Sequence, residues 1–580
     1  MLIQKGKMTM NNLVSIPKIP LEDWVSSAVS WLTTNLSGFF DAIQSGGQYI
    51  MDALTNGLTA VPMALMIIGI TVIAIVTTPK KIGFPLFTLL GLLLIANQGL
   101  WSDLMNTVTL VIMASIVSLI IGIPLGILTA KSQKTAVVVQ PILDFMQTMP
   151  GFVYLIPAVA FFGIGVVPGV FASIIFALPP MVRMTSLGIR QVPVDLVEAA
   201  DSFGSTTWQK LFKLELPSAK NTILAGANQT IMLALSMVVT ASMIGAPGLG
   251  RGVLSAVQHA DVGSGFVNGL GLVILAIVID RFTQKFNTQP GQKAVTKPWR
   301  RWTVLAALLV MIGGGVVNTL TSDKTTGQKV TIGYVEWDSE VASSNVLAES
   351  LRQHGYDVTL TPLDNAVLWQ SLSNNQIDIS VSAWLPDTHK ALYDKYKNDV
   401  TLLGPNLKGV KTGLVVPDYM DVNSISDLTT QANKTITGIE PGAGEMATAA
   451  NALKSYSNLS GWNLSSSSSG AMVSALDKAY KNKQDVVVTG WSPHWMFSKY
   501  HLKFLSDPKN VFGSGETINT IVNKKFKTSN PKAYKVADNF NWTKDDMESV
   551  MLDIQNGQTP KQAAAKWIKS HQKLVDSWYK

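Results

Sequence analysis

The sequence contains no cysteine in its 580 residues. This absence excludes disulfide-linked scaffolds, thiolate zinc or iron–sulfur sites and cysteine nucleophiles. Charged residues are also scarce, at 14% of the chain against 47% hydrophobic residues, and the mean hydropathy is +0.25. A soluble domain usually carries about 25% charged residues, so a wholly soluble protein, a disordered chain and a coiled coil are excluded. The composition indicates a membrane protein joined to a soluble part.

The scarcity of charge is confined to one region. Residues 61–320 are poor in charge, whereas the chain after residue 320 has ordinary soluble composition. Residues 321–328 (TSDKTTGQ) are short and polar, which is typical of a linker. We therefore expect an N-terminal segment at 1–60, a membrane domain at 61–320, a linker at 321–328 and a soluble domain at 329–580.

Long apolar stretches in the membrane domain can each cross about 30 Å of hydrocarbon as a helix of about 20 residues. We expect about eight such spans, at 61–78, 82–100, 104–129, 139–164, 168–187, 221–246, 264–280 and 303–320. The fourth is the least regular, because Pro141, Pro150 and Pro157 interrupt it. Prolines are tolerated where neighbouring helices compensate for the lost hydrogen bonds.

Basic residues are concentrated in the loops that follow spans one, three, five and seven, while the opposite loops contain only Arg251. The basic set is Lys80, Lys81, Lys131, Lys134, Arg183, Arg190, Lys210, Lys213, Lys220, Arg281, Lys285, Lys293, Lys297, Arg300 and Arg301. The positive-inside rule makes that side cytoplasmic. Eight spans then place both termini and the soluble domain outside. This asymmetry accounts for the net charge of +8, so we expect no nucleic-acid partner.

A separate amphipathic segment lies at 21–43. Its apolar residues recur every three or four positions, with Trp24 and Trp31 close to the stripe, and the opposite face is polar. This pattern fits a helix that lies in the membrane interface. A helix that packs on neighbouring spans fits it equally well.

The most specific motif of the membrane domain lies in the cytoplasmic loop at 194–217. A helical pattern at 194–203 leads to Gly204, and a second amphipathic piece at 208–214 ends before Pro217. Two short helices joined at a glycine form a projection that another protein can hold. The residues resemble the EAA loop of ABC importer permeases, which docks into a groove of the ATPase, except that the family has isoleucine where this chain has Leu214. The resemblance assigns coupling to Glu198, Ala199, Ala200, Gly204, Leu216 and Pro217.

No G-x-x-x-x-G-K-[ST] phosphate loop occurs in the sequence. We therefore expect a non-catalytic subunit without a metal or cofactor of its own, with ATP and magnesium bound by a separate ATPase. Acidic residues within the spans are few, namely Asp144 and Asp280 near span ends. This scarcity disfavours an ion-driven secondary transporter.

The soluble domain alternates strands and helices. We expect strands at 330–335, 356–360, 377–382, 435–439 and 486–489, helices at 343–354 and 366–374, and a helical C-terminal stretch from residue 531. The serine run at 465–469 is expected to be a loop or the start of a helix. The pattern predicts two α/β lobes, each with a mostly parallel sheet and ligands at the carboxyl ends of the strands.

Tryptophan follows three of these strands in the same relative position, as Trp337, Trp384 and Trp491. A single such tryptophan would be more often a core residue than a ligand-binding one. Three in equivalent positions favour one shared cleft. Indole faces attract cations, and a quaternary ammonium group cannot donate hydrogen bonds, so rings that surround it are its natural site.

A carboxylate on the same ligand would need a second contact. The glycine-rich turn 438–444 follows a strand and offers backbone N–H groups to an anion. His389 and His494 each follow one of the tryptophans and could donate a further hydrogen bond. The residues alone do not separate the two histidines.

These segments together resemble the glycine betaine binding protein of osmoprotectant importers, and nearly the whole chain resembles the fused subunit of the Gram-positive glycine betaine ABC importer. The resemblance implies a MetI-like permease fused to a type II periplasmic-binding-protein fold. It selects His389, Gly438 and Ile439 as the carboxylate contacts and the three tryptophans as the ammonium cage. It also implies two ATPase subunits, a second copy of this chain and contact with membrane lipid. A membrane chemoreceptor for quaternary ammonium ligands is the alternative.

Overall fold

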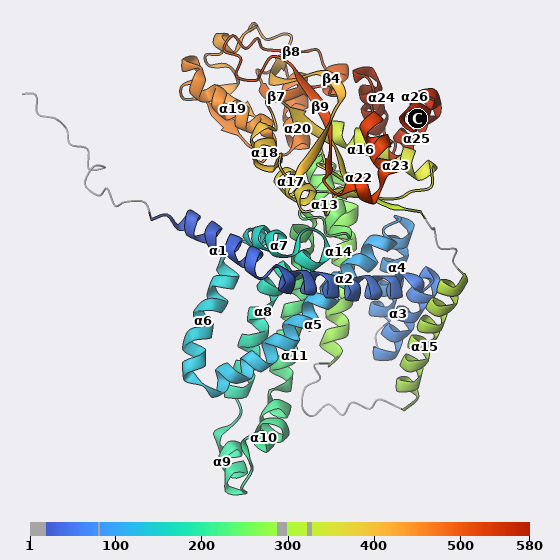
Figure 1. Cartoon of the computed structure of the whole chain (residues 1–580). Coiled ribbons are helices and arrows are strands. Elements are labelled where there is room, and N and C mark those ends of the chain that lie inside the picture. Colours follow the sequence, from blue (N-terminus) through green and yellow to red (C-terminus); the bar gives the residue numbers. More distant parts are fainter. Residues whose placement is uncertain (1–18, 79–81, 287–297, 322–326) are drawn as a thin grey trace, which may run out of the picture.

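The computed structural model describes residues 19–78, 82–286, 298–321 and 327–580. Figure 1 shows a helical part, coloured blue to green, and an α/β domain, coloured yellow to red, that lies against one end of it. Most of the expected linker at 321–328, together with Lys80, Lys81, Lys293 and Lys297 of the basic loops, lies outside the described residues.

The apolar intervals expected as spans lie mostly on helices. The helices of this part are α1 Leu21–Asn35, α2 Ser37–Ala60, α3 Met63–Thr77, α4 Gly83–Asn97, α5 Trp101–Lys131, α6 Gln133–Thr148, α7 Leu155–Phe162, α8 Val166–Arg190, α9 Val194–Ser202, α10 Thr207–Lys210, α11 Leu216–Ser236, α12 Val238–Ser242, α13 Leu249–Gln258, α14 Val262–Phe286 and α15 Pro298–Thr321.

Among the described residues, four helical stretches are long and apolar enough to cross a membrane, or six if each of two bent pairs forms one span. The four are Trp101–Lys131, Val166–Arg190, Thr207–Ser242 and Val262–Gln284. Helix α4 and the Leu309–Asn318 part of α15 are apolar but shorter. The protein is therefore a membrane protein, and the number of eight spans stays a prediction.

The interval 139–164, expected to be the least regular span, is sharply bent. Helix α6 and the helical segment Gly151–Phe162 meet at an angle of 106°. Met149 between them is extended, with φ −69° and ψ 133°, because the following Pro150 disfavours helical backbone at the residue before it. The chain therefore turns sharply at this point and α7 lies across the end of the bundle near the α/β domain (Figure 1).

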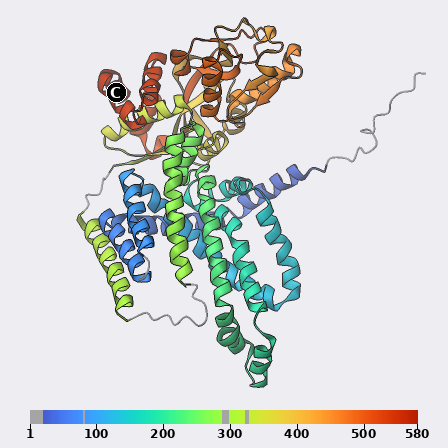
Figure 2. The same cartoon turned by 180° about the vertical axis from the view of Figure 1, so that it is seen from behind.

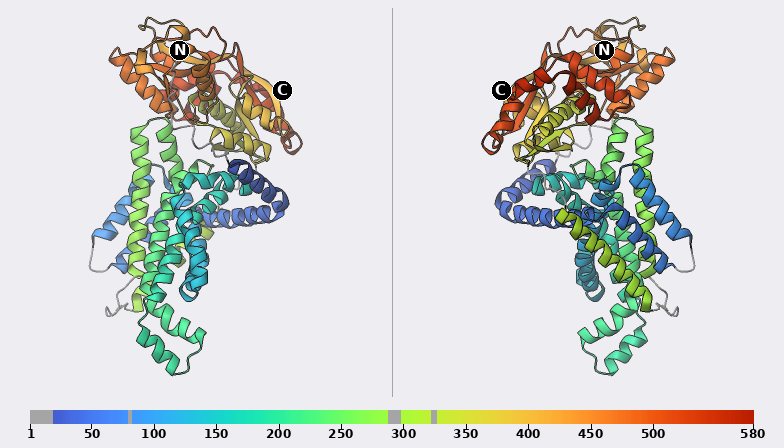
Figure 3. Two further views of the ribbon diagram at one scale, coloured as in Figure 1. Left: turned by 90° about the vertical axis from the view of Figure 1, so that its left-hand side faces the viewer. Right: turned by 90° about the vertical axis from the view of Figure 1, so that its right-hand side faces the viewer.

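The amphipathic segment at 21–43 is not one helix either. It is broken at Leu36, where φ is −113° and ψ is 19°, and α2 continues to Ala60. Helix α1 buries none of its residues and exposes Trp24 and Trp31, whereas α2 packs against α5, α7, α8 and α15. Figure 3 shows these two helices projecting to one side of the bundle. A helix in the membrane interface therefore fits α1, and a helix that packs on neighbouring spans fits α2.

The α/β domain is built on a mixed sheet with the order β2-β1-β3-β9-β4-β7-β5-β6, and β8 pairs with β4. The strands are β1 Lys329–Tyr334, β2 Asp357–Pro362, β3 Ile379–Leu385, β4 Val400–Pro417, β5 Thr435–Thr437, β6 Asn463–Ser465, β7 Val487–Ser492, β8 Leu502–Phe504 and β9 Glu516–Asn523. The first lobe contains the parallel strands β1, β2 and β3, and the second lobe the parallel strands β5, β6 and β7. Antiparallel β4 and β9 join the two lobes.

The five expected strands are present as β1, β2, β3, β5 and β7, but sequence analysis missed the short β6 and β8 and the two strands, β4 and β9, that join the lobes. The apolar pattern of β4 is interrupted by Gly404, Pro405 and Gly409, and its register with β9 shifts at these positions. Such interruptions hide the alternation by which a strand is usually found.

Helices cover both lobes. They are α16 Asp338–Gln353, α17 Asn365–Ser373, α18 Lys390–Tyr396, α19 Gly444–Ser455, α20 Ser469–Lys481, α21 Met496–Lys499, α22 Phe526–Ser529, α23 Pro531–Asn539, α24 Lys544–Gln555, α25 Pro560–Ser570 and α26 Gln572–Trp578. The C-terminal helices α24 and α25 pack on α16 of the first lobe.

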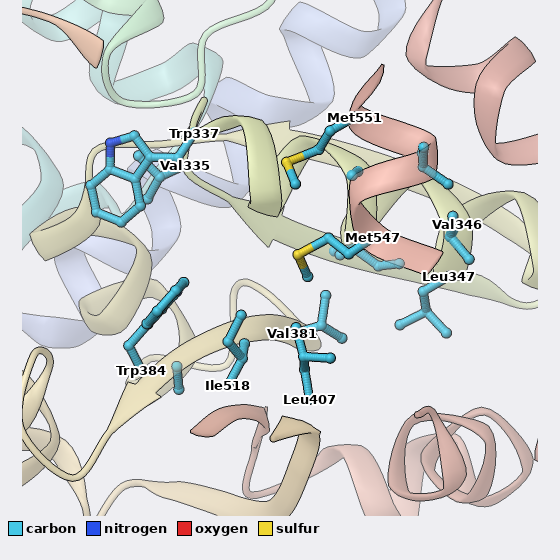
Figure 4. Packing of buried hydrophobic residues seen from close by; sticks show 14 of the residues in the cluster. Val335, Trp337, Val346, Leu347, Val381, Trp384, Leu407, Ile518, Met547 and Met551 are labelled. Carbon is cyan, nitrogen blue, oxygen red and sulfur yellow. The ribbon is translucent and has the colours of Figure 1, made fainter. Parts of the chain in front are cut away.

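Figure 4 shows part of the core of the α/β domain. Val346 and Leu347 of α16 face Met547 and Met551 of α24. The same cluster continues along β3, β4 and β9 to Trp337 and Trp384 at its edge. The core therefore holds two of the candidate cage tryptophans in place.

Candidate ligand-binding site and coupling loop

A cavity of about 320 Å³ lies at the carboxyl ends of β1, β3 and β7. Trp337, Trp384 and Trp491 line it, and their exposed fractions are only 7%, 4% and 5%. Trp337 and Trp384 belong to the first lobe, and Trp491 lies in β7 of the second. The structure thus brings the three predicted residues together around one cavity. The rest of its lining is Ser339, Thr388, His389, Thr412, Ile439, Ala443, Gly444 and Glu445.

Two of the three predicted carboxylate contacts, His389 and Ile439, are in this lining. Among the described residues, the N–H of Ile439 donates to no protein acceptor, so it is available to an anion. The N–H of Gly438 instead donates to the Ser465 carbonyl at 2.8 Å. The role of Gly438 stays a prediction, since its N–H is already bonded within the second lobe.

The imidazole of His389 is buried and neutral. Burial lowers its pKa to about 4. The backbone N–H of Trp384 donates to Nδ1 at 3.2 Å, which leaves the proton on Nε2. Nε2 lies 3.4 Å from the side-chain amide nitrogen of Asn365. His389 therefore lines the cavity as a neutral imidazole with the Asn365 amide beside its Nε2.

His494 occupies a different place from His389. It is fully buried, its Nδ1 accepts the Met496 N–H at 3.0 Å, and its Nε2 lies 3.4 Å from Oδ2 of Asp338. Trp495 donates from Nε1 to Oδ1 of the same Asp338 at 3.0 Å. Burial raises the pKa of Asp338, but these hydrogen bonds and the charge of His494 outweigh it and lower the pKa to about 2. Asp338 therefore links the first lobe to the second, and His494 serves that link.

Sequence analysis missed a carboxyl group in the cavity wall. Glu445 is 3% exposed, and burial raises its pKa to about 8, although the N–H groups of Gly413 and Gly490 hydrogen-bond to it and act in the opposite direction. Glu445 is thus protonated at neutral pH. Its position directly after the 438–444 turn was the available signal, because the residue that follows such a turn opens the next helix and faces the same site.

The predicted coupling loop lies at the opposite end of the bundle from the α/β domain, as Figure 2 shows from behind. Helices α9 and α10 meet at Gly204, whose φ of 73° is the left-handed conformation that glycine adopts readily. Glu198 and Ala199 are exposed and Ala200 is half-buried. An apolar surface is exposed on the same loop, made of Val194, Leu196, Phe203, Trp208 and Phe212. This is the kind of surface that a partner protein covers.

The expectation that the second helix of this loop ends before Pro217 is wrong. A π-helical turn at Leu211–Glu215 leads directly into α11, which begins at Leu216 with Pro217 in its first turn. A proline is tolerated there because its missing N–H has no intrahelical acceptor. Glu215 is buried and pairs with Lys131 at the end of α5 at 2.5 Å. The loop is thereby connected rigidly to two long helices.

Comparison with known proteins gives matches to both parts of the chain. Residues 122–289 match the family described as binding-protein-dependent transport system inner membrane component, and residues 328–570 match the substrate binding domain of ABC-type glycine betaine transport system. The chain is 56% identical over 275 residues to the glycine betaine/carnitine transport permease protein GbuB of Listeria monocytogenes, a match that covers 47% of this chain and 97% of that protein.

The α/β domain has its own relatives. It is 53% identical over 153 residues to the glycine betaine/carnitine transport binding protein GbuC of the same organism, covering 26% of this chain and 51% of that protein. The crystal structure of lactococcal OpuAC in its closed-liganded conformation complexed with glycine betaine is 63% identical, covers 44% of this chain and 100% of that chain, and has a TM-score of 0.43.

A helical membrane domain with an exposed apolar loop, joined to a two-lobed domain with an aromatic cavity, is the architecture of a transport protein that has its own ligand-binding domain. The chain belongs to the family of binding-protein-dependent ABC transport permeases, with a substrate binding domain of the glycine betaine type fused to the permease. The family resemblance seen in the sequence and the fold class it implied are confirmed.

Proposed function

We propose that this chain captures glycine betaine, or a related quaternary ammonium osmoprotectant, outside the cell membrane and passes it inward in an ATP-driven importer. One observation carries the proposal: three indole rings, the neutral imidazole of His389 and Ile439, whose N–H has no acceptor among the described residues, line a single cavity. The permease GbuB, which this chain matches along 97% of its length, is named for glycine betaine and carnitine transport.

The chemistry of the cavity suits a zwitterion. Each indole face in contact with the ammonium group contributes about 0.5–2 kcal/mol of cation–π attraction. The same ring also buries methyl groups of the ligand's ammonium. The ligand carboxylate accepts hydrogen bonds from His389 and Ile439, which a neutral imidazole and a backbone N–H can both donate. Because Trp491 belongs to one lobe and Trp337 and Trp384 to the other, binding holds the lobes together.

The exposed coupling loop supports a separate ATPase as partner. Its apolar side chains and its glycine turn project beyond the bundle, where a groove on the ATPase can receive them (Figure 1). ATP and magnesium are bound by that subunit, and this chain supplies no catalytic residue. The complete importer contains two ATPase subunits and a second copy of this chain, as the family resemblance implies.

The orientation follows from the two ends of the bundle. Helix α10, which ends at Lys210, lies at the end of the bundle away from the α/β domain, and Lys131 pairs with Glu215 next to it. Arg251 lies on α13 and lines a pocket together with Glu336 of the α/β domain. The first end is cytoplasmic by the positive-inside rule, so the α/β domain is extracellular. Ile75, Leu90 and Ile120 on α3, α4 and α5 are exposed and suit contact with lipid.

Reconstitution tests the function directly. The full chain and its ATPase, placed in lipid vesicles with ATP inside, should accumulate radiolabelled glycine betaine from outside, and the uptake should stop when a non-hydrolysable ATP analogue replaces ATP. A chemoreceptor would bind the ligand without uptake, which would contradict the proposal. The permease relatives and the coupling loop already favour the importer over that alternative.

A further inference from the structure

The turn at the end of α13 lies between the permease and the α/β domain (Figure 1). Its backbone is closed by two hydrogen bonds, from Ala260 N–H to Val257 O at 3.3 Å and from Asp261 N–H to Ala256 O at 2.8 Å. Ala260 has φ of 52°, a left-handed conformation that is unfavourable for a residue with a Cβ. The surroundings therefore determine the shape of this turn, and His259 projects from it.

The turn contacts the second lobe through backbone. Ser468 donates from Oγ to the Val257 carbonyl at 3.0 Å. Gly470, at the start of α20, is so close that a Cβ there would lie 2.1 Å from the His259 carbonyl carbon. Only glycine fits at this position while the two parts are docked.

The same turn contacts the first lobe through polar side chains. Ser255 donates from Oγ to Oε2 of Glu336 at 3.2 Å. Nδ1–H of His259 donates to the Ser255 carbonyl at 2.9 Å and lies 3.9 Å from the same Glu336 oxygen. His259 of the permease thus lies at the seam where both lobes meet the membrane domain.

Glu336 lies against His259 at this seam, and the charges of two further carboxylates, Asp338 and Glu440, act on the imidazole. Burial alone lowers the pKa of the imidazole, but the charges of Asp338, Glu336 and Glu440 raise it, and the net pKa is above its ordinary value. Glu336 and Asp338 belong to the first lobe, and Glu440 follows β5 of the second. The imidazolium form is therefore favoured by acids that two different lobes contribute.

Two of these acids also connect the lobes. Glu440 accepts the Nε1–H of Trp337 at 3.1 Å, and Asp338 accepts the Nε1–H of Trp495 at 3.0 Å. Glu336 and Asp338 stand two residues apart on the first lobe, and closure of the lobes around the cavity adds Glu440 to this pair. In an open domain Glu440 would lie apart from the other two carboxylates.

We propose that His259 helps the permease to recognise the closed binding domain, by placing a cation against Glu336 and Asp338 of the first lobe, to which closure of the lobes adds Glu440 of the second. The inference rests on the proposed importer function and adds the coupling step to it. His259 acts as a positioning residue: it touches no ligand, but it makes docking of the permease depend on the loaded state of the domain.

Replacement of His259 in the full chain, assembled with its ATPase in vesicles, tests the proposal. His259→Ala should leave the affinity for glycine betaine unchanged and lower glycine-betaine-stimulated ATP hydrolysis by about tenfold, since a desolvated charge contact is lost. His259→Lys should recover most of the stimulation. An open pocket beside His259, lined in part by Asp338, Trp495 and Gln555, can take the longer side chain.

Docking can be measured without ATP hydrolysis. The chain has no cysteine, so Val257→Cys with Ser468→Cys gives a pair that a short bis-maleimide can join without background from other residues of this chain. Glycine betaine should increase cross-linking in the parent and in His259→Lys, and not in His259→Ala. Gly470→Ala should lower stimulated hydrolysis as His259→Ala does, whereas its control Gly515→Ala, where no atom lies within 4 Å of an added Cβ, should not.

Undiminished ligand-dependent cross-linking in His259→Ala would overturn the proposal. If His259→Ala lowers the stimulated ATP hydrolysis and His259→Lys does not recover it, the positive charge of His259 is not what the docking requires. If the parent pair cross-links on glycine betaine addition but vesicles show no uptake, the importer function fails while the recognition by His259 stands.

Discussion

The Nε1–H of Trp337 donates a hydrogen bond to Oε2 of Glu440 at 3.1 Å, and this bond ties a cage wall of the first lobe to the second lobe. The other oxygen of Glu440 accepts the N–H of Ser469, the first residue of α20, at 3.0 Å. Each carboxylate oxygen of Glu440 thus has its own donor, and the plane of the Trp337 ring is set by a residue across the cleft.

Glu440→Gln should therefore weaken ligand binding without changing the shape of the site. A side-chain amide presents one acceptor instead of two, so either Trp337 or Ser469 loses its partner. Loss of a hydrogen bond to a charged group costs about 1.5–3 kcal/mol, which corresponds to roughly one to two decades in affinity. Calorimetric titration of the purified full chain with glycine betaine measures this. The exposed Glu22→Gln in α1 is the matched control, and an unchanged affinity in Glu440→Gln would show that the bond does not orient the ring.

The cage tryptophans should each be required for affinity. Trp337→Ala, Trp384→Ala and Trp491→Ala remove cation–π attraction of up to about 2 kcal/mol together with buried methyl contact, so each should raise the Kd for glycine betaine at least about 30-fold. Trp→Phe at the same positions should be milder, since a ring face of weaker potential remains. Quenching of tryptophan fluorescence on titration reports the Kd.

Trp567 provides the control for this series. It is also buried, but its ring packs edge-on against that of Trp542, with the ring centroids 5.6 Å apart. Its Nε1–H donates to Oδ1 of Asp546, and neither contact is with a residue of the cavity lining. Trp567→Phe should lower the free energy of unfolding and leave the Kd unchanged. A neutral isostere of glycine betaine, with carbon in place of the ammonium nitrogen, separates charge from shape; equal affinity for both ligands would mean an apolar pocket only.

Part of the proposed cage could be predicted from the sequence, because parallel strands end at the same edge of a sheet. Trp337 and Trp384 stand at such ends of β1 and β3, so the strand assignments predict that these two converge. Trp491 stands at the end of β7 in the other lobe, and its approach depends on β4 and β9. The antiparallel β4 and β9 could not be predicted, because their pairing joins segments about a hundred residues apart. The closed cavity depends on this link between the lobes, and the local alternation of apolar and polar residues did not predict it.

Hydrogen-bond partners were also beyond prediction. Nothing local distinguishes His389 from His494, because the difference lies in what each meets: Trp384 N–H in one case and Asp338 of the other lobe in the second. Likewise the N–H of Gly438 is bonded to Ser465, a contact between two parallel strands' ends. In the membrane domain, Pro150 predicted an interruption but not the 106° bend it produces.

The carboxylate contacts should separate glycine betaine from choline. If His389 and Ile439 hold the ligand carboxylate, choline should bind about one to two decades more weakly, the effect of losing a charge-assisted hydrogen bond. His389→Ala should remove most of this difference by weakening glycine betaine alone. Competition calorimetry with both ligands measures it. Equal affinities of choline and glycine betaine for the parent protein would exclude an anion site.

Glu445 should make this preference depend on pH. Its pKa is raised to about 8, chiefly by burial, so the cavity wall is neutral below that pH and negatively charged above it. A negative wall favours choline, a pure cation, over a zwitterion. The affinity for choline relative to glycine betaine should therefore rise by about tenfold between pH 7 and pH 9, following the linkage between ionisation and binding.

Two substitutions locate this pH dependence. Glu445→Gln should abolish it, because the amide does not ionise. Glu340→Gln is the matched control: Glu340 is buried with a pKa also raised to about 8, but it is absent from the cavity lining. If the ratio of the choline affinity to the glycine betaine affinity stays constant with pH in the parent protein, Glu445 does not ionise in this range. If that ratio still shifts in Glu445→Gln, the charge of the wall belongs to another group.

The coupling loop should be dispensable for capture and required for transport. Glu198→Ala with Gly204→Ala should abolish ligand-stimulated ATP hydrolysis, because the left-handed φ of 73° at Gly204 sets the angle between α9 and α10, although an added Cβ there would meet no atom within 4 Å. Phe203→Ser and Trp208→Ser should act in the same way by removing apolar contact with the ATPase, since the two side chains are 91% and 70% exposed in this chain. The affinity for glycine betaine should not change in any of these variants. Full ATPase stimulation in the double mutant, measured in vesicles beside the parent protein, would remove the basis for assigning this loop to the ATPase.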